Sequence, residues 1–185
     1  MSTIARFSLA EYDRMVECGV FSSRGRRRLE FIRGEIREMA AIGPFHEDVV
    51  DRLAEWSARN TSPGEIRIRV QNSIGLPELE SAPEPDIAWV VAGDYSSGRP
   101  KGQRVLLVIE VAESSLPYDQ GEKADLYAEA EVADYWVVNL VDRTIEVHRE
   151  PAGGHYRQVE TFRGDQEVRP LAKPDLALRP SILWK

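Results

Sequence analysis

The alternation of hydrophobic and polar positions predicts several strands that are buried on one face only. In residues 66–70, Ile and Val alternate with Arg, which is the pattern of a half-buried strand. Residues 26–40 predict a β-hairpin, because Leu29 and Phe31 alternate before a turn at 33–34. Three further strands, joined by tight turns and paired antiparallel, are predicted at 135–141, 144–150 and 155–164.

Two other segments are apolar almost throughout and predict strands buried on both faces. They are residues 86–91 (DIAWVV) and 105–112 (VLLVIEVA), and the second, the most apolar in the chain, is expected at the centre of the sheet. If these two strands pair as a hairpin, the start of the first meets the end of the second. Asp86 and Glu110 would then lie side by side.

Helices are predicted where apolar residues recur at intervals of three and four. A short helix follows Ser8, which forms a capping-box pattern with Glu11. A second helix, within residues 45–60, has an apolar stripe that begins at His46.

A third helix is expected to start near Gln120, because Asp119 and Glu122 form another capping-box pattern. One face of this helix should lie against the sheet, and it carries Lys123, Leu126, Tyr127 and Ala130. The proline-rich residues 170–180 predict an extended tail. The fold class is therefore α/β or α+β, a mixed β-sheet flanked by helices with additional antiparallel hairpins.

Length and composition fit one globular domain over residues 1–185, with 42% hydrophobic and 30% charged residues. No apolar stretch approaches the roughly 18 residues of a membrane-spanning helix. Residues 1–12 lack the apolar region of a signal peptide, so we expect a cytoplasmic protein with no membrane partner. The single cysteine, Cys18, is expected to be a small buried or half-buried hydrophobic residue, with a nucleophilic role as the less favoured alternative.

The net charge of −7 argues against loose binding to nucleic acid through overall electrostatics. One short segment is nevertheless strongly basic, with Arg24, Arg26, Arg27 and Arg28. A solvated loop that leads into a strand fits this run, and so does an edge that contacts phosphate.

Glu110 stands inside an otherwise apolar strand, where burying its charge without a partner would cost several kcal/mol. A divalent cation between Asp86 and Glu110 would balance that charge. Mg²⁺ suits such a place, because it takes oxygen ligands and keeps part of its water shell. The backbone carbonyl of Val111 is a candidate third ligand, and we expect Mn²⁺ to substitute for Mg²⁺.

Three more residues are candidates for the same site. Lys123 is placed to orient a water molecule or to offset charge on a scissile phosphate, although a snorkelling lysine or a simple ion pair with Glu110 fits the spacing as well. Glu35 is a candidate for completing the metal shell, and the alternative is an ordinary polar hairpin residue. His46 is a candidate for positioning a water or contacting a phosphate, and the alternative is a core histidine.

Several other catalytic motifs are absent from the chain. It contains no GxGxxG or GxxxxGKS/T nucleotide loop, no HExxH zinc motif and no GxSxG nucleophile elbow. The sequence therefore gives no motif evidence for a nucleotide-binding protein, a zinc protease or a serine hydrolase.

An ordered series of short motifs resembles the Uma-two family, bacterial proteins described as "putative restriction endonucleases" and a branch of the PD-(D/E)XK nuclease superfamily. The motifs are LEFIRGEIREMA, GPFHEDVV, PEPDIAWV, VLLVIEVAESS and DQGEKADLYAEAEVADYWVV. The similarity covers about residues 8–150. It implies a restriction-endonuclease-like core, with the metal site at one end of a mixed sheet.

The resemblance assigns site residues by their position in the motifs. Pro85–Asp86 matches the first part of the superfamily motif and Glu110 matches the second. Ala112 stands where the superfamily has its lysine, and Lys123 takes that place from the following helix. The family's acidic residue after the glycine and its histidine after the GP turn correspond to Glu35 and His46.

Two departures from the family pattern affect connections only. The chain reads EVAESSLP where the family usually has EVLSPS, so the loop before the helix is expected to differ in shape. Glu131 stands where a glycine is common. Neither change removes an expected metal ligand or the lysine.

The resemblance implies a Mg²⁺-dependent endonuclease that hydrolyses DNA and acts as a homodimer. In this hypothesis Asp86, Glu110 and Val111 bind the metal and Lys123 orients the attacking water, while Glu35 and His46 assist. Two alternatives stay open: a catalytically silent nuclease fold that binds DNA or dimerises, and a metal-dependent phosphoesterase that acts on RNA or a nucleotide.

Overall fold

The computed structural model describes residues 3–22 and 28–184. Within these residues, six strands form one mixed sheet in the order β3-β4-β5-β6-β7-β8, and two more form a separate hairpin. The sheet strands are β3 (Ile66–Val70), β4 (Ile87–Val91), β5 (Val105–Ala112), β6 (Asp134–Asn139), β7 (Thr144–Ala152) and β8 (His155–Arg163). The hairpin strands are β1 (Leu29–Ile32) and β2 (Glu35–Glu38). The predicted fold class, a mixed sheet with helices and an additional antiparallel hairpin, is confirmed.

The centre of the sheet contains its one parallel pair among the described strands. β5 and β6 are parallel, whereas the other neighbouring pairs are antiparallel. A parallel pair needs a crossover connection that passes over the sheet. The crossover consists of α3 (Leu116–Tyr118), the π-helical turn η4 (Asp119–Lys123) and α4 (Ala124–Glu129). It brings Lys123 back over β5, the strand that carries Glu110.

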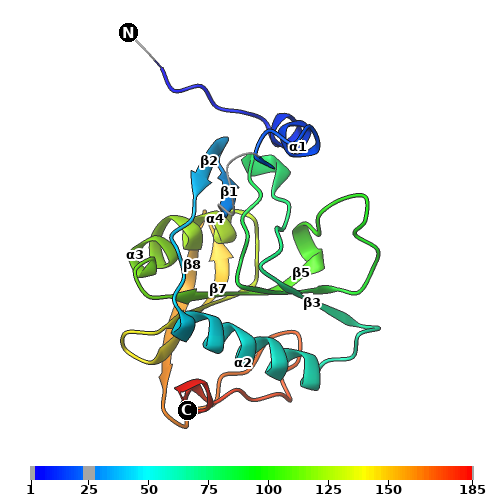
Figure 1. The fold of residues 1–185 in the computed structure, drawn as a ribbon. Coiled ribbons are helices and arrows are strands. Elements are labelled where there is room, and N and C mark those ends of the chain that lie inside the picture. Colours follow the sequence, from blue (N-terminus) through cyan, green and yellow to red (C-terminus); the bar gives the residue numbers. More distant parts are fainter. Residues whose placement is uncertain (1–2, 23–27, 185) are drawn as a thin grey trace.

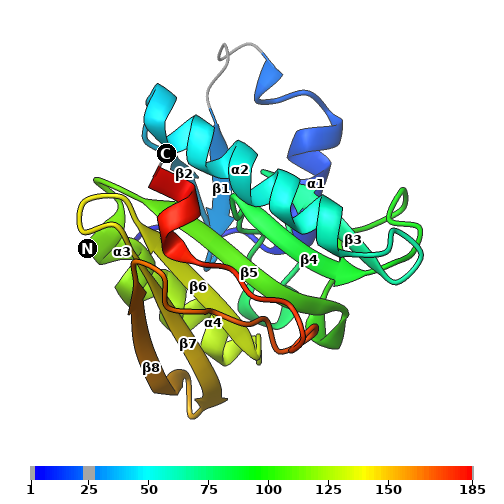
Figure 2. The same cartoon turned by 90° about the horizontal axis from the view of Figure 1, so that it is seen from below.

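Different helices cover the two faces of the sheet (Figures 1 and 2). On one face, α2 (Pro44–Asn60) and the C-terminal helix η5 (Pro180–Trp184) share a hydrophobic core with the central strands. On the other face, α4 shares a hydrophobic cluster with β4, β5 and β6 and also contacts β7 and β8. Beyond it, α1 (Leu9–Glu17) packs on the hairpin by stacking Tyr12 on Phe31, with ring centroids 4.6 Å apart. Two single-turn helices in connections are η2 (Pro77–Leu79) and η3 (Gly102–Arg104).

The predicted start of the third helix is wrong. The helical segment begins at Leu116 rather than near Gln120, because Pro117 lies in the first turn, where its missing N–H is tolerated. Asp119 is therefore not a cap. It lies inside the helical segment, in the π-helical turn, and is buried. This turn places Asp119 and Lys123 on the side that faces the sheet.

The prediction that Cys18 is buried or half-buried is also wrong, since its side chain is exposed. The capping box of Ser8 and Glu11 does form at the start of α1. However, α1 buries only Tyr12, so Cys18 at its C-terminal cap has no core to enter.

The segment after β8 runs back along the molecule through a series of turns and ends in η5, rather than forming the continuous extended tail that the prolines predicted. Val168 and Leu178 form an isolated antiparallel bridge, and η5 then packs on α2. Among the described residues, no helix is both long and apolar enough to cross a membrane.

Candidate active site

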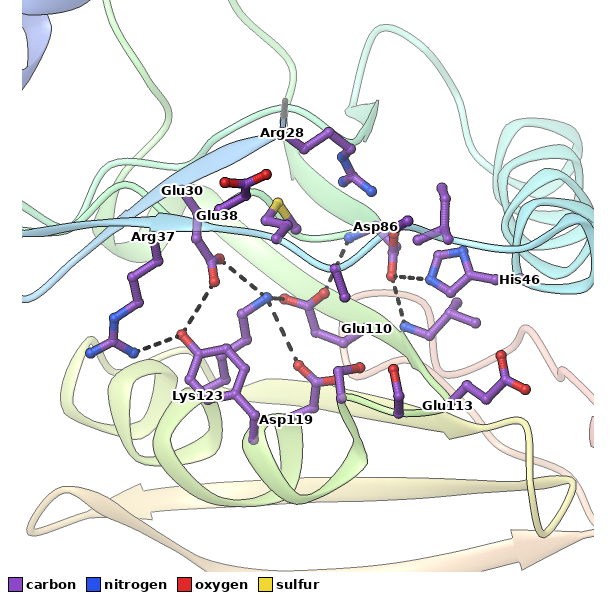
Figure 3. Close-up of a pocket in the computed structure, with 18 of the residues that line it drawn as sticks. Arg28, Glu30, Arg37, Glu38, His46, Asp86, Glu110, Glu113, Asp119 and Lys123 are labelled. Atoms are coloured by element: carbon purple, nitrogen blue, oxygen red, sulfur yellow. Dashed lines mark hydrogen bonds and ion pairs between the residues drawn. The ribbon is translucent and has the colours of Figure 1, made fainter. Parts of the chain in front are cut away.

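A pocket of about 310 Å³ opens where β4 begins and β5 ends. Its walls come from the hairpin, the start of α2, the end of β5 and the crossover helices (Figure 3). Of the residues expected to form the site, the structure brings together Asp86, Glu110, Val111, Lys123 and His46 around this pocket.

Asp86 and Glu110 meet because β4 and β5 pair as the apolar runs predicted. Ile87 lies opposite Ile109, so the residues just outside this pair are neighbours. The Asp86 backbone N–H donates to Glu110 Oε2 at 3.4 Å, and the Val111 N–H donates to Asp86 Oδ2 at 2.9 Å. Both carboxylates are therefore held in place by backbone groups of the adjoining strand.

The crossover helices supply the partners of Glu110. Lys123 Nζ donates to Glu110 Oε1 at 3.0 Å, and the Tyr127 hydroxyl donates to the same oxygen at 2.8 Å. The side chains of Lys123 and Glu110 are each only 4% exposed. The carboxylate in the apolar strand thus has a buried cationic partner within this chain.

The charges of this pair reflect burial and the surrounding carboxylates. Burial raises the pKa of the Glu110 carboxyl to about 8, although Lys123 opposes the shift. Burial alone would lower the pKa of Lys123, but Glu110, Glu30 and Asp119 outweigh it and raise that pKa above its ordinary value. Lys123 is consequently an ammonium group surrounded by carboxyl groups.

Asp86 is held by His46 and Gln71 on the side away from Lys123. Pro44 opens α2, and this places His46 in the first turn, with Nε2 3.2 Å from Asp86 Oδ2. Gln71 Nε2 donates to the other carboxylate oxygen, Oδ1, at 3.2 Å. Burial tends to raise the pKa of Asp86, but these contacts and the Val111 N–H lower it overall, which favours the carboxylate. Asp86 in turn raises the pKa of His46, against the effect of burial.

Glu30 is a site residue that the sequence reasoning missed. Its Oε2 lies 3.4 Å from Lys123 Nζ, and its Oε1 accepts a hydrogen bond of 3.2 Å from the Tyr118 hydroxyl. The alternation of Leu29 and Phe31 identifies the apolar positions of the hairpin and assigns no role to Glu30. A usable signal is that Phe31 and Ile32 are adjacent and both apolar, because a hairpin with a single buried face would alternate.

Asp119 was missed because it was interpreted as a helix cap. Its Oδ1 lies 3.8 Å from Lys123 Nζ, one helical turn away, and burial raises its pKa. Lys123 therefore lies among three carboxyl groups, those of Glu110, Glu30 and Asp119.

The structure does not place Glu35 in the pocket. Its side chain pairs with Arg6 at 2.9 Å and with Arg37 at 3.0 Å instead. Glu35 lies opposite Ile32, next to the turn, whereas Glu30 lies two positions further from the turn on the same hairpin. The expectation that Glu35 completes a metal shell is thus not supported by its position, and Glu30 is the hairpin carboxylate nearest to Lys123.

Three buried polar atoms in the pocket walls have no hydrogen-bond partner in the part of the chain that the structure describes. They are Arg28 Nη2, His46 Nδ1 and Glu30 Oε2, and the last of these still has its ion-pair contact with Lys123 at 3.4 Å. Buried polar groups are normally satisfied, so such atoms point to a water or ligand. Of the basic run noted above, Arg28 is described and lines the pocket, whereas Arg24, Arg26 and Arg27 lie outside the described residues.

The donor set of the pocket suits a hard divalent cation. Asp86 and Glu110 provide adjacent carboxylate oxygens and Val111 lines the same pocket. Among the described residues, no group of three or more His, Cys, Asp or Glu side chains is arranged to hold a metal on its own. Mg²⁺ needs no such group, because it binds through one or two carboxylates and keeps several waters. The residues therefore fit Mg²⁺ by the chemistry of their oxygens.

The mixed sheet carries this pocket of carboxylates and a lysine at one end, which is the arrangement expected of a restriction-endonuclease-like fold. The structure is similar to the crystal structure of a "putative nuclease belonging to DUF820" from Anabaena variabilis, with a TM-score of 0.74 and 15% sequence identity, over 96% of this chain and 97% of that one. The profile of the Uma2 family, described as "Putative restriction endonuclease", matches residues 9–181. The chain belongs to this family. A comparison with curated proteins finds no match.

Proposed function

We propose that the protein is a divalent-metal-dependent endonuclease that hydrolyses phosphodiester bonds of DNA. The observation that carries the proposal is the buried contact of Lys123 with Glu110, beside Asp86, in the wall of an open pocket. Membership of the Uma2 family supports the same reaction class.

Asp86 and Glu110 would hold Mg²⁺, with the Val111 carbonyl as a further candidate ligand, and Mn²⁺ would substitute. When bound, the ion would polarise a phosphoryl oxygen and supply charge stabilisation at neutral pH. It would also act as a second counter-charge for Glu110, whose pKa burial raises to about 8.

The side chains of the pocket have separate roles in this proposal. Lys123 donates to the attacking water or to a phosphate oxygen, and so offsets the negative charge that develops as the phosphorus is attacked. Glu30 and Asp119 keep it charged and in place. His46 and Gln71 fix the orientation of Asp86, while Tyr127 fixes that of Glu110.

Arg28 is the candidate contact for the substrate phosphate. Its Nη2 is buried in the pocket wall and has no hydrogen-bond partner among the described residues. A guanidinium forms short, charge-assisted hydrogen bonds to phosphate oxygens. The substrate would therefore satisfy a donor that the protein leaves unpaired.

The direct test is cleavage of supercoiled plasmid with Mg²⁺ or Mn²⁺, against a chelator control. Metal-dependent nicking by the native protein, lost on Asp86→Asn substitution, is the expected result. Asp48→Asn on the exposed side of α2 is the matched control and should cleave normally. Binding of DNA without cleavage under any metal would point to a catalytically silent module, and cleavage of RNA alone would point to an RNA phosphoesterase.

We also propose that the enzyme acts as a homodimer in the cytoplasm. Single-site enzymes usually cut both strands of a duplex as two protomers, and this chain has one candidate site among its described residues. Sedimentation of the purified protein tests this, with twice the 20.9 kDa chain mass as the expected result.

A further inference from the structure

Three arginine side chains surround the ring of Tyr95 at the edge of the sheet. The guanidinium carbons of Arg67, Arg69 and Arg104 lie 5.9, 5.8 and 5.4 Å from the ring centroid. Arg67 and Arg69 belong to the edge strand β3, and Arg104 belongs to η3. We call these four residues the arginine surface.

The positive charge of this surface is not neutralised by ion pairs with carboxylates among the described residues. Arg104 uses its donors on the Ala92 carbonyl and the Tyr95 hydroxyl. Arg69 Nε is buried without a hydrogen-bond partner within the described part of the chain. Burial and the adjacent Arg67 also lower the pKa of Arg69, which shows that its charge is disfavoured there.

Two nearby carboxylates are used elsewhere. Asp13 pairs with Arg99 at 2.7 Å. Asp94 accepts a hydrogen bond from the backbone N–H of Ser96, although Arg67 is close enough to lower its pKa further. Arg69 Nη2 also donates to the Ser73 carbonyl at 3.3 Å. The guanidinium N–H groups of Arg67, and the remaining ones of Arg69 and Arg104, are the donors that an anion would meet.

The arginine surface lies on the same face of the sheet as the candidate active site. Arg67 and Arg69 lie opposite Val90 and Ala88, which share a hydrophobic cluster with Tyr127, the partner of Glu110. In an antiparallel sheet, residues directly opposite each other point to the same face.

β3 also leads from the arginine surface to the site. Gln71, just after β3, donates to Asp86. The four residue-to-residue steps from Arg67 to Gln71 span about 13 Å at roughly 3.3 Å per step. One DNA strand carries about four phosphates over that length of helix axis.

We propose that the arginine surface binds phosphates of the DNA strand whose neighbouring phosphate occupies the active site. This inference rests on the proposed DNA substrate. A nucleic acid fits better than an acidic peptide, because phosphates at regular spacing can reach both the arginine surface and the pocket. Elsewhere the chain is acidic, with a net charge of −7, so a local cationic surface is needed to offset repulsion of DNA.

The test is binding of labelled duplex DNA, measured by fluorescence anisotropy over a series of salt concentrations with a chelator present. The slope of log K against log salt should become shallower by about 0.9 for each arginine–phosphate interaction that a substitution removes. Arg67→Gln should remove one such interaction, and Arg67→Gln with Arg69→Gln should remove two and bind roughly tenfold more weakly. Arg69 is half-buried, so the double variant can fail to fold. Arg67 is exposed, so the single variant Arg67→Gln should fold and still tests the inference.

The matched control is Arg52→Gln with Arg59→Gln. These arginines lie on α2, on the opposite face, and each is paired with a carboxylate four residues away. Their removal should leave both the affinity and the slope unchanged.

The outcomes separate this inference from the proposed function. Shallower slopes for the β3 variants support the inference even if no metal supports cleavage. If the β3 variants keep the salt dependence of the native protein, the inference is overturned even if the protein cleaves DNA. It is also overturned if the α2 control variant lowers the slope as much as the β3 variants do. Binding of polyglutamate in place of DNA overturns it as well.

Discussion

Lys123 and Glu110 form a 3.0 Å ion pair that joins the crossover helices to the central strand. The twelve residues between them are the end of β5 and the first part of the crossover that a parallel β5–β6 pair requires, so the topology itself returns the chain to the strand that carries Glu110. The PD-(D/E)XK motif places its lysine two residues after the acidic residue. In this chain that position is Ala112, which is fully buried in the apolar cluster.

Replacing Lys123 tests its role in chemistry. Lys123→Ala should reduce DNA cleavage on the order of 10²–10³-fold, the usual effect of removing one donor that stabilises developing charge. The change also leaves three carboxyl groups without their cation and should lower the free energy of unfolding by roughly 3–5 kcal/mol. Cleavage rates and urea unfolding curves measure the two effects.

A second variant separates chemistry from stability. Tyr127→Phe removes the other hydrogen bond to Glu110 and keeps the packing of the ring. It should cost about 1 kcal/mol of stability and change cleavage much less than Lys123→Ala does. Native cleavage by a folded Lys123→Ala protein would refute the role assigned to the lysine.

Glu30 and Glu35 provide a paired test on one hairpin. Glu30→Gln removes a carboxylate 3.4 Å from Lys123 and should reduce cleavage roughly tenfold, because Lys123 loses one of the charges that hold it. Glu35→Gln changes a residue outside the pocket that pairs with Arg6 and Arg37, and should leave cleavage within about twofold of native. Initial rates on plasmid decide between them. A larger loss for Glu35→Gln would return that residue to the site.

The paired strands were predictable from the sequence, whereas the contacts between distant elements were not. Asp86 and Glu110 follow from two apolar runs, because these runs are consecutive strands and pair as neighbours across the loop of residues 92–104. The role of Glu30 depends on how the hairpin docks over the crossover helices. The adjacent apolar residues Phe31 and Ile32 indicate that both faces of the hairpin are covered, but not by which element. The start of the third helix was mispredicted because a capping-box pattern at Asp119 competed with the proline signal at Pro117.

A pH dependence of stability is expected from Glu146 and His148 on β7. His148 Nε2 lies 2.7 Å from Glu146 Oε1, and this hydrogen bond lowers the pKa of Glu146 below its ordinary value. A carboxyl with a lowered folded pKa stabilises the protein above its unfolded pKa, about 4.3, and loses that effect as the pH falls through the folded value.

Glu146→Gln should therefore unfold more easily at pH 6, by about 1 kcal/mol, and should lose less stability than the native protein between pH 5 and pH 3. Urea unfolding at these pH values measures both. Glu160→Gln, at an exposed position on β8, is the control and should follow the native curve. If the free energy of unfolding falls equally with pH in the native protein and in Glu146→Gln, the hydrogen bond between Glu146 and His148 does not cause the pH dependence of stability.

Binding of a metal ion should be visible without any nuclease assay. A ligand that binds only the folded protein stabilises it by RT ln(1 + [L]/Kd), which is about 2.7 kcal/mol at a hundredfold excess over Kd. Mn²⁺ or Mg²⁺ should therefore raise the melting temperature, and a chelator should reverse the shift. Asp86→Asn and Glu110→Gln should each abolish the shift, since each removes a charged oxygen ligand.

The control for this experiment must be a buried aspartate of similar structural importance. Asp134 is fully buried and pairs with Arg149 at 2.9 Å, and it is not among the residues that line the pocket. Asp134→Asn should melt at a lower temperature than the native protein and still gain the full increment from Mn²⁺. If Asp134→Asn also loses the increment, the shift reflects general stability. If Asp86→Asn keeps it, the metal binds elsewhere and the site assigned to Asp86 and Glu110 is wrong.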